Sequence, residues 1–260
     1  MRQKFHLFRL AIPAIIICLS SYLLGPNQYA RESTSTETYQ AKRLEMEDRV
    51  QERYNLQNET LLEAMREVPR HLFVPEGLRH LDYSDDTLPI SENRAVPAPH
   101  MAAWIIETLS LPPGERVLVA STGCGYITAL LAQLEYLEIY SLEVNPEIAQ
   151  QAFGTLHYLG YNQIHLAQRD GYLGWEENAP YDAIIVPAAV DHLPEPLIDQ
   201  LADGGRLLIP IGSSGTYQTM WKFEKHRQRF KAFNHGSVKF FPLKTDAHPQ
   251  PLTFHFPIQE

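Results

Sequence analysis

The chain has 260 residues, a length that fits one large domain or two small ones, and 44% of them are hydrophobic while 20% are charged. This composition is that of an ordinary globular protein, and it excludes a collagen-like chain, a low-complexity disordered chain and a polytopic membrane protein. The net charge of -9 argues against nucleic-acid binding, which needs clustered Lys and Arg side chains to neutralise phosphates. With 2 Cys residues the chain cannot form a disulfide framework.

The N-terminal segment differs from the rest of the chain. Arg2, Lys4 and Arg9 precede an apolar run over residues 10–24, an order that is typical of a secretory signal. The run is shorter than the roughly 20 apolar residues that cross a bilayer as a helix. We therefore predict a signal peptide or N-terminal membrane anchor over residues 1–25, with membrane contact through residues 10–24 and a periplasmic or membrane-anchored protein. The alternative is a core helix of a cytoplasmic protein.

The next segments are predicted from composition and periodicity. Residues 26–44 are polar and rich in Ser and Thr, which predicts a linker. From about Glu45 to Val68 apolar residues recur at helical spacing, and Pro69 ends the pattern. The Pro-rich stretch over residues 72–100 predicts extended loops with short turns, and a further helix is expected over Met101–Leu111.

Short apolar stretches then alternate with helical patterns. Strands are expected at Arg116–Ala120, Glu138–Leu142, Gln163–Ala167, Tyr181–Val186 and Gly205–Ile211, with helices between them at about Ile127–Leu134, Glu147–Leu159 and Pro194–Leu201. This alternation predicts an α/β fold with a mostly parallel sheet covered on both faces. Two more strands, Gln218–Phe223 and Ser237–Leu243, have no helix between them and predict a C-terminal antiparallel hairpin. The domain is placed at residues 45–245 and a tail at residues 246–260.

Residues suited to a nucleotide-like ligand follow three of the expected strands. A turn with Gly123 and Gly125 follows the first strand, and glycines at that place let a ligand approach the backbone closely. Glu143 comes directly after the second strand, about 20 residues on, where an acid can accept hydrogen bonds from ribose hydroxyls. Asp170 and Gly171 follow the third strand, where an acid can accept from the adenine amino group. We therefore predict a ligand site at the carboxyl ends of these strands.

Many short strings, in order along the chain, carry a family resemblance from about Arg49 to Leu243. They include AM at 64–65, VPRHLFVP at 68–75, APHM at 98–101, TGCGY at 122–126, APYDAIIV at 179–186, QLADGGRL at 200–207 and VKFFPL at 238–243. With these strings the chain resembles protein-L-isoaspartate O-methyltransferases. The resemblance implies a Rossmann-like methyltransferase fold with an N-terminal helical cap, S-adenosylmethionine as cofactor, and isoaspartyl-containing peptides or proteins as substrate; we also expect a monomer. The implied cofactor contacts are Ser121, Gly123, Gly125, Glu143, Asp170 and Gly171.

The chain also departs from the family pattern, mainly at the cofactor and the reaction centre. The first motif normally has an acid and a glycine where this chain has Val119 and Ser121. The Thr and Ser hydroxyls that line the methyl-transfer site in the family align with Ala95 and Pro97, and the Gly-Gln pair before them is replaced by residues 93–94, Asn-Arg. Ser121 would be strained if the turn needs a positive φ there.

These departures leave the function between two hypotheses. The first is an active protein-repair methyltransferase, in which no catalytic residue is named because Pro97 occupies the hydroxyl position. The second is a degenerate family member, a binding or scaffold protein with little or no catalysis. The His residues show no metal-ligand spacing, so no metal site is predicted. His100 and Asp85 are candidates for substrate contact, and Cys124 is interpreted as a small spacer rather than a redox-sensitive thiol.

Overall fold

The computed structural model describes residues 26–91, 94–213, 215–227 and 229–246, and it separates the chain into two compact units, Met1–Lys42 and Arg43–Glu260. Within the described ranges, no helix is long and apolar enough to cross a membrane. The predicted signal peptide or anchor and nearly all of the predicted tail lie outside these ranges. Both therefore stay predictions.

The first described element is a long helix where a linker was expected. Helix α2 runs over Pro26–Tyr54, so residues 26–44, which were predicted as a polar linker, are helical. The physical reason lies in the positions of the helix breakers, because Pro26 stands at the helix start, where proline is well tolerated, and no Gly or Pro follows it within the helix. A polar composition means that this part of the chain has no apolar face to bury. It does not by itself prevent the segment from forming a helix.

The helical pattern that was expected to run unbroken to Val68 is divided into two helices. Asn55 has a positive φ of 53° after α2, and Asn58 caps the next helix by accepting a hydrogen bond from the Leu61 amide at 3.1 Å. The remaining helices are α3 (Glu59–Glu67), α4 (Pro99–Leu109), α5 (Tyr126–Gln133), α6 (Pro146–Tyr158) and α7 (Glu195–Asp199), with 3-10 helices η1 (Arg70–Phe73), η2 (Glu76–Leu81) and η3 (Glu176–Asn178).

Strands form one large sheet and one small hairpin. The small hairpin pairs β1 (Leu88–Ser91) with β2 (Arg94–Val96), so the stretch expected as extended loops contains regular structure. The large sheet contains β3 (Arg116–Val119), β4 (Glu138–Leu142), β5 (His165–Ala167), β6 (Tyr181–Ile185), β7 (Leu201–Ile211), β8 (Gln218–His226) and β9 (Arg229–Val238).

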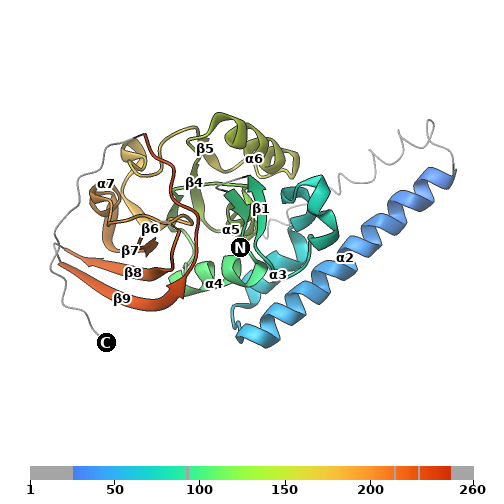
Figure 1. The fold of residues 1–260 in the computed structure, drawn as a ribbon, viewed down its shortest axis with the longest axis horizontal. Helices are drawn as coiled ribbons and strands as arrows, with labels where there is room; N and C mark the ends of the chain where they lie inside the picture. The colour runs from blue at the N-terminus through green and yellow to red at the C-terminus, as the bar shows by residue number, and fades with distance from the viewer. Residues whose placement is uncertain (1–25, 92–93, 214, 228, 247–260) are drawn as a thin grey trace, which may run out of the picture. The chain divides into compact units, whose positions relative to one another are not determined.

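The order of the large sheet confirms the predicted α/β fold. The strands lie in the order β5-β4-β3-β6-β7-β8-β9, with β3 through β7 parallel and β8 and β9 antiparallel (Figure 1). The central strand β3 is buried, with Val117, Leu118 and Val119 each 0% exposed, as expected for a strand whose two faces are both covered. Because β3, β4 and β5 are parallel neighbours, the residues that follow them meet at one edge of the sheet.

The end of the hairpin differs from its prediction. Strand β9 ends at Val238, so most of the strand expected over Ser237–Leu243 does not form. The apolar residues that suggested a strand there, Phe240 and Phe241, line a cavity instead. One short parallel bridge, Ala189 to Pro242, keeps this segment beside the sheet.

Candidate active site

The turn between β3 and α5 is shaped by its glycines. Gly123 and Gly125 have φ values of 56° and 92°, a region that glycine adopts without a steric penalty. The Thr122 amide donates to the Leu142 carbonyl at 2.7 Å and ties the turn to the end of β4. A Cβ atom built on Gly123 would meet no atom within 4 Å, so the turn borders open space there. Ser121 does not have a positive φ, so the condition under which its side chain would strain the backbone is not met.

Glu143 lies directly after β4, against this turn. It is 1% exposed, and its carboxylate accepts hydrogen bonds from the amides of Gly123 at 3.0 Å and Asn145 at 3.1 Å. These two backbone donors fix the position of the carboxylate beside the turn. The structure therefore brings two of the predicted ligand contacts, Glu143 and Gly123, into one hydrogen-bonded unit.

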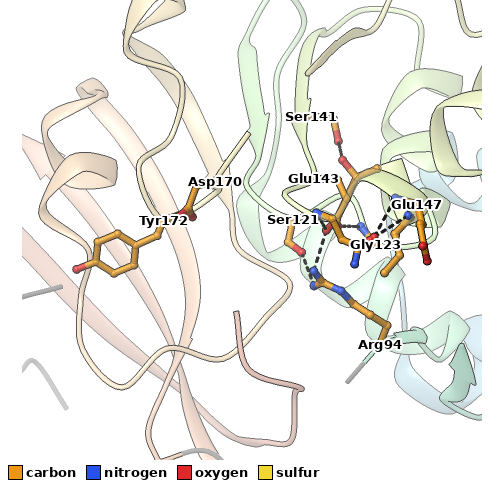
Figure 2. A network of polar contacts seen from close by, with 11 residues as sticks. Arg94, Ser121, Gly123, Ser141, Glu143, Glu147, Asp170 and Tyr172 are labelled. Carbon is orange, nitrogen blue, oxygen red and sulfur yellow. Dashed lines mark hydrogen bonds and ion pairs between the residues drawn. The ribbon is translucent and has the colours of Figure 1, made fainter. Parts of the chain in front are cut away.

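A further side chain, that of Arg94 of β2, completes this network (Figure 2). Its Nη2 donates to Oε1 of Glu143 at 2.7 Å, and its Nη1 donates to Oγ of Ser121 at 3.2 Å. Arg94 is 8% exposed, and Ser121 is 6% exposed. The carboxylate that was expected to face ribose hydroxyls is thus paired with a guanidinium of the same chain.

Sequence reasoning did not assign Arg94 to the site. Arg94 and Glu143 are 49 residues apart, so no local pattern relates them. The one available signal was that Arg94 belongs to the pair that departs from the family's Gly-Gln. A departure beside a site shows that something has changed there, but it does not reveal which partner the new side chain contacts.

Asp170 and Gly171 form the third part of the predicted ligand site. A Cβ built on Gly171 would overlap the Ala120 carbonyl oxygen and lie 2.6 Å from its carbon, so the two loops pack backbone to backbone. The Asp170 carboxylate accepts from the Tyr172 amide at 2.9 Å, the Thr245 hydroxyl at 2.7 Å and the Asp246 amide at 2.9 Å. Figure 2 shows Asp170 apart from the network around Glu143.

A cavity of about 570 Å³ opens beside the glycine turn. Its described lining residues include Arg94, Pro97, Ala98, His100, Met101, Ser121, Gly123, Cys124, Tyr126, Lys239, Phe240 and Phe241. Among the predicted cofactor contacts, Ser121 and Gly123 belong to this described lining, whereas Gly125, Glu143, Asp170 and Gly171 do not. The cavity therefore meets the cofactor turn at one wall, and its other walls are largely apolar.

The two candidates for substrate contact, His100 and Asp85, form one unit at this cavity. Oδ1 of Asp85 lies 2.8 Å from Nδ1 of His100 and also accepts from the His100 amide at 3.1 Å. Tyr54 donates to Oδ2 of Asp85 at 3.1 Å, and its ring stacks on the His100 ring with centroids 4.4 Å apart. These contacts hold the His100 ring in one orientation. In the part of the chain that the structure describes, no cluster of His, Cys, Asp and Glu could hold a metal ion.

Burial raises the pKa of the Cys124 thiol to about 11, which predicts an unreactive cysteine. Because the thiolate is the nucleophile, we expect Cys124 in a Cys18→Ser variant to react with an aromatic disulfide reagent at pH 8 roughly a hundredfold more slowly in the folded protein than in denaturant. The release of the coloured thiol, followed with time, measures both rates. Folded and unfolded rates within a factor of about ten would contradict the spacer interpretation.

Residues 41–248 match the family model described as protein-L-isoaspartate(D-aspartate) O-methyltransferase. The chain belongs to this family. It is 44% identical over 185 residues to the protein-L-isoaspartate O-methyltransferase of a Picosynechococcus species, with 71% of this chain and 82% of that relative covered.

Solved structures of the protein-L-isoaspartate O-methyltransferase family share this fold. One of that name superposes with a TM-score of 0.72 at 26% identity, covering 78% of this chain and 66% of the other. A second, from Plasmodium falciparum, was solved in complex with S-adenosyl-L-homocysteine and has a TM-score of 0.68 at 24% identity, covering 77% of this chain and 97% of the other. These likenesses confirm the Rossmann-like methyltransferase architecture.

Proposed function

We propose that this chain transfers a methyl group from S-adenosylmethionine to the carboxylate of L-isoaspartyl residues in damaged proteins. The observation that carries the proposal is the family match over residues 41–248, because it spans both the glycine turn and the segment that completes the cavity. The related structure that contains S-adenosyl-L-homocysteine supports the choice of cofactor. Nothing in the comparisons favours the non-catalytic alternative.

The chemical groups at the site are of the kinds that S-adenosylmethionine requires. Gly123 presents a turn with open space beside its Cα, and Glu143 supplies a carboxylate next to that turn. Asp170 supplies a second carboxylate after β5, on a loop that Gly171 packs against Ala120. We propose that Glu143 accepts from the ribose hydroxyls, that Asp170 accepts from the adenine amino group, and that the turn with Ser121, Gly123 and Gly125 lies against the remainder of the cofactor.

Methyl transfer to a carboxylate depends more on the positioning of the two reactants than on a strong base. When bound, S-adenosylmethionine would supply a methyl group on a sulfonium; the ionised carboxylate would form a bond to the methyl carbon as the carbon–sulfur bond breaks, and S-adenosyl-L-homocysteine would leave. A carboxylic acid with a pKa near 4 is already ionised at neutral pH, so no side chain has to remove a proton. The apolar walls from Pro97, Met101 and Phe240 exclude water, and the charge of Lys239 attracts a carboxylate to the cavity. These residues act by binding and orienting.

The proposal is tested by incubating the purified chain with S-adenosylmethionine and two peptides of one sequence, one with isoaspartate and one with ordinary aspartate. We expect methyl ester formation on the isoaspartyl peptide alone, measured as methanol released on base treatment. Binding of S-adenosyl-L-homocysteine is measured in parallel by calorimetry. Cofactor binding without methylation of either peptide would overturn the assigned substrate, and the absence of both would overturn the methyltransferase assignment.

Restoring the family residues at two cavity positions is expected to increase activity. In the double variant Pro97→Ser and Ser121→Gly, the new hydroxyl can hydrogen-bond a charged carboxylate, a contact that changes a rate by roughly ten- to a hundredfold. The measurement is kcat/KM for the isoaspartyl peptide in the variant and in the parent chain. An unchanged or lower kcat/KM would mean that the divergence from the family is not confined to these positions.

We propose that residues 45–245 act as a monomeric methyltransferase domain and that residues 246–260 are a tail. We also propose that residues 1–25 export the chain or anchor it in a membrane. The basic and then apolar order of the N-terminal residues supports this export or anchoring. An exported enzyme would need a cofactor that is made in the cytoplasm, so the location has a direct biochemical consequence. Cell fractionation with and without residues 1–30 tests it: an unchanged soluble location for both forms would contradict export and anchoring.

A further inference from the structure

Two residues that depart from the family pattern contact each other at the cofactor site. Arg94 stands where the family has Gln, and Ser121 stands where the family has the first glycine of its motif. In the structure Nη1 of Arg94 donates to Oγ of Ser121 at 3.2 Å, while Nη2 pairs with Glu143 at 2.7 Å (Figure 2). The two departures therefore belong to one arrangement, and its centre is the acid that we assign to the ribose.

The Glu143 carboxylate has little capacity left for a ligand. Oε1 accepts from both Arg94 and the Asn145 amide, and Oε2 accepts from the Gly123 amide. A carboxylate offers about four acceptor positions in all, and a ribose diol brings two donors that must reach it together. The ribose hydroxyls and the guanidinium therefore compete for the same oxygen.

Burial makes this competition direct. The Glu143 side chain is 0% exposed and the Arg94 side chain is 10% exposed, and of the two residues only Arg94 lines the cavity. The cavity has a volume of about 570 Å³, which gives the guanidinium room to move once it leaves Glu143. Arg94 thus blocks a ribose from reaching Glu143, and the cavity offers space into which the Arg94 side chain can move.

We propose that Arg94 is a latch on the ribose end of the cofactor site. In the absence of cofactor its guanidinium is paired with Glu143. The ribose of S-adenosylmethionine can hydrogen-bond Glu143 only after it displaces this guanidinium. The latch rests on the proposed function, because it assigns Glu143 to a ribose. It follows that the affinity of this chain for its cofactor is reduced by the free energy of separating a buried ion pair. A Gln at position 94, as in the family, carries no such charge.

A latch and a purely structural ion pair predict opposite changes in cofactor affinity for the substitution Arg94→Gln. In Arg94→Gln the buried Glu143 loses a charged partner, so the melting temperature falls under either role. A latch also predicts tighter binding of S-adenosyl-L-homocysteine, since Glu143 is then free to accept from the ribose. A structural pair predicts binding that weakens together with stability. The informative result is therefore the combination of lower stability and higher affinity.

The test is calorimetric titration of the parent chain and Arg94→Gln with S-adenosyl-L-homocysteine, adenosine and 2′,3′-dideoxyadenosine. The expected result is a Kd for S-adenosyl-L-homocysteine that falls roughly ten- to a hundredfold, the range for one hydrogen-bonded charged contact. The gain should appear with adenosine and be absent with dideoxyadenosine, which lacks the diol. Arg206→Gln is the matched control, because Arg206 pairs with the Glu115 carboxylate and neither residue is part of the described cavity lining, so the Kd for S-adenosyl-L-homocysteine should not change.

The other results of this titration contradict the latch, the proposed function, or both. Unchanged or weaker binding of S-adenosyl-L-homocysteine in Arg94→Gln, or an equal gain with dideoxyadenosine, overturns the latch while leaving the proposed function intact. Binding by neither protein overturns the proposed function and the latch together. If Arg94→Gln does not fold, Arg94→Lys replaces it: an ammonium lacks the paired donors that reach Ser121 and Glu143 together, so a latch predicts an intermediate gain, and no gain overturns it.

Discussion

Gly171→Ala is expected to destabilise the protein severely. The added Cβ would overlap the Ala120 carbonyl oxygen and lie 2.6 Å from the carbonyl carbon, and neither atom can move without moving the backbone at the end of β3. Overpacking that forces the backbone to shift costs about 1–3 kcal/mol or more, so we expect a loss of at least about 3 kcal/mol in the free energy of unfolding. Urea denaturation followed by circular dichroism measures this loss.

Gly154→Ala is the matched control for that substitution. Gly154 lies within α6, and a Cβ built on it would meet no atom within 4 Å. Alanine is favoured over glycine in a helix by about 1 kcal/mol, so this variant should be as stable as the parent or more stable. Equal denaturation midpoints for the two variants would show that the loops after β3 and β5 are not packed backbone to backbone.

Glu143→Gln is expected to abolish most of the cofactor affinity and to lower stability at the same time. The amide keeps the shape of the side chain but leaves the Arg94 guanidinium buried without its anion, and breaking a buried pair costs about 3–5 kcal/mol. A neutral amide also accepts hydrogen bonds from ribose hydroxyls less strongly than a carboxylate does, which is worth roughly ten- to a hundredfold in affinity. Calorimetry with S-adenosyl-L-homocysteine and thermal melting measure the two effects.

The double variant Glu143→Gln with Arg94→Gln separates the two effects of that substitution. Removing both charges removes the unpaired guanidinium, so stability should return most of the way to that of the parent chain. Cofactor affinity should stay low because the carboxylate is still missing. Recovery of affinity in the double variant would show that Glu143 acts on the cofactor only through Arg94.

Much of the fold followed from the alternation of strand and helix patterns. Runs such as Arg116–Val119 and Tyr181–Ile185 are short, apolar and rich in β-branched residues, and the structure places them as buried parallel strands. The helix over residues 26–44 was missed because a polar segment carries no periodic signal, although no helix breaker follows Pro26 within it. The strand expected up to Leu243 failed because Phe240 and Phe241 are apolar for a different reason, namely that they line the cavity.

The site was predictable residue by residue but not as a network. Gly123, Glu143 and Asp170 could be named because each follows a strand of the predicted sheet, and their positions depend on topology alone. Their partners could not be named, since Arg94 reaches Glu143 from a hairpin that no pattern predicted, and Thr245 reaches Asp170 from 75 residues away. Side-chain pairing between distant segments is set by packing, which the spacing of residues along the chain does not encode.

The contact between Arg94 and Ser121 makes the history of each position depend on the other. A glycine at position 121 takes an oxygen away from a guanidinium that is 8% exposed, and a glutamine at position 94 takes the charged donor away from a buried hydroxyl. Either single reversion to the family residue therefore leaves one of these two polar groups without its partner, while the double reversion removes both groups and leaves Glu143 as the residue that loses a charged partner. The two positions are therefore expected to change together, because one hydrogen bond joins their side chains.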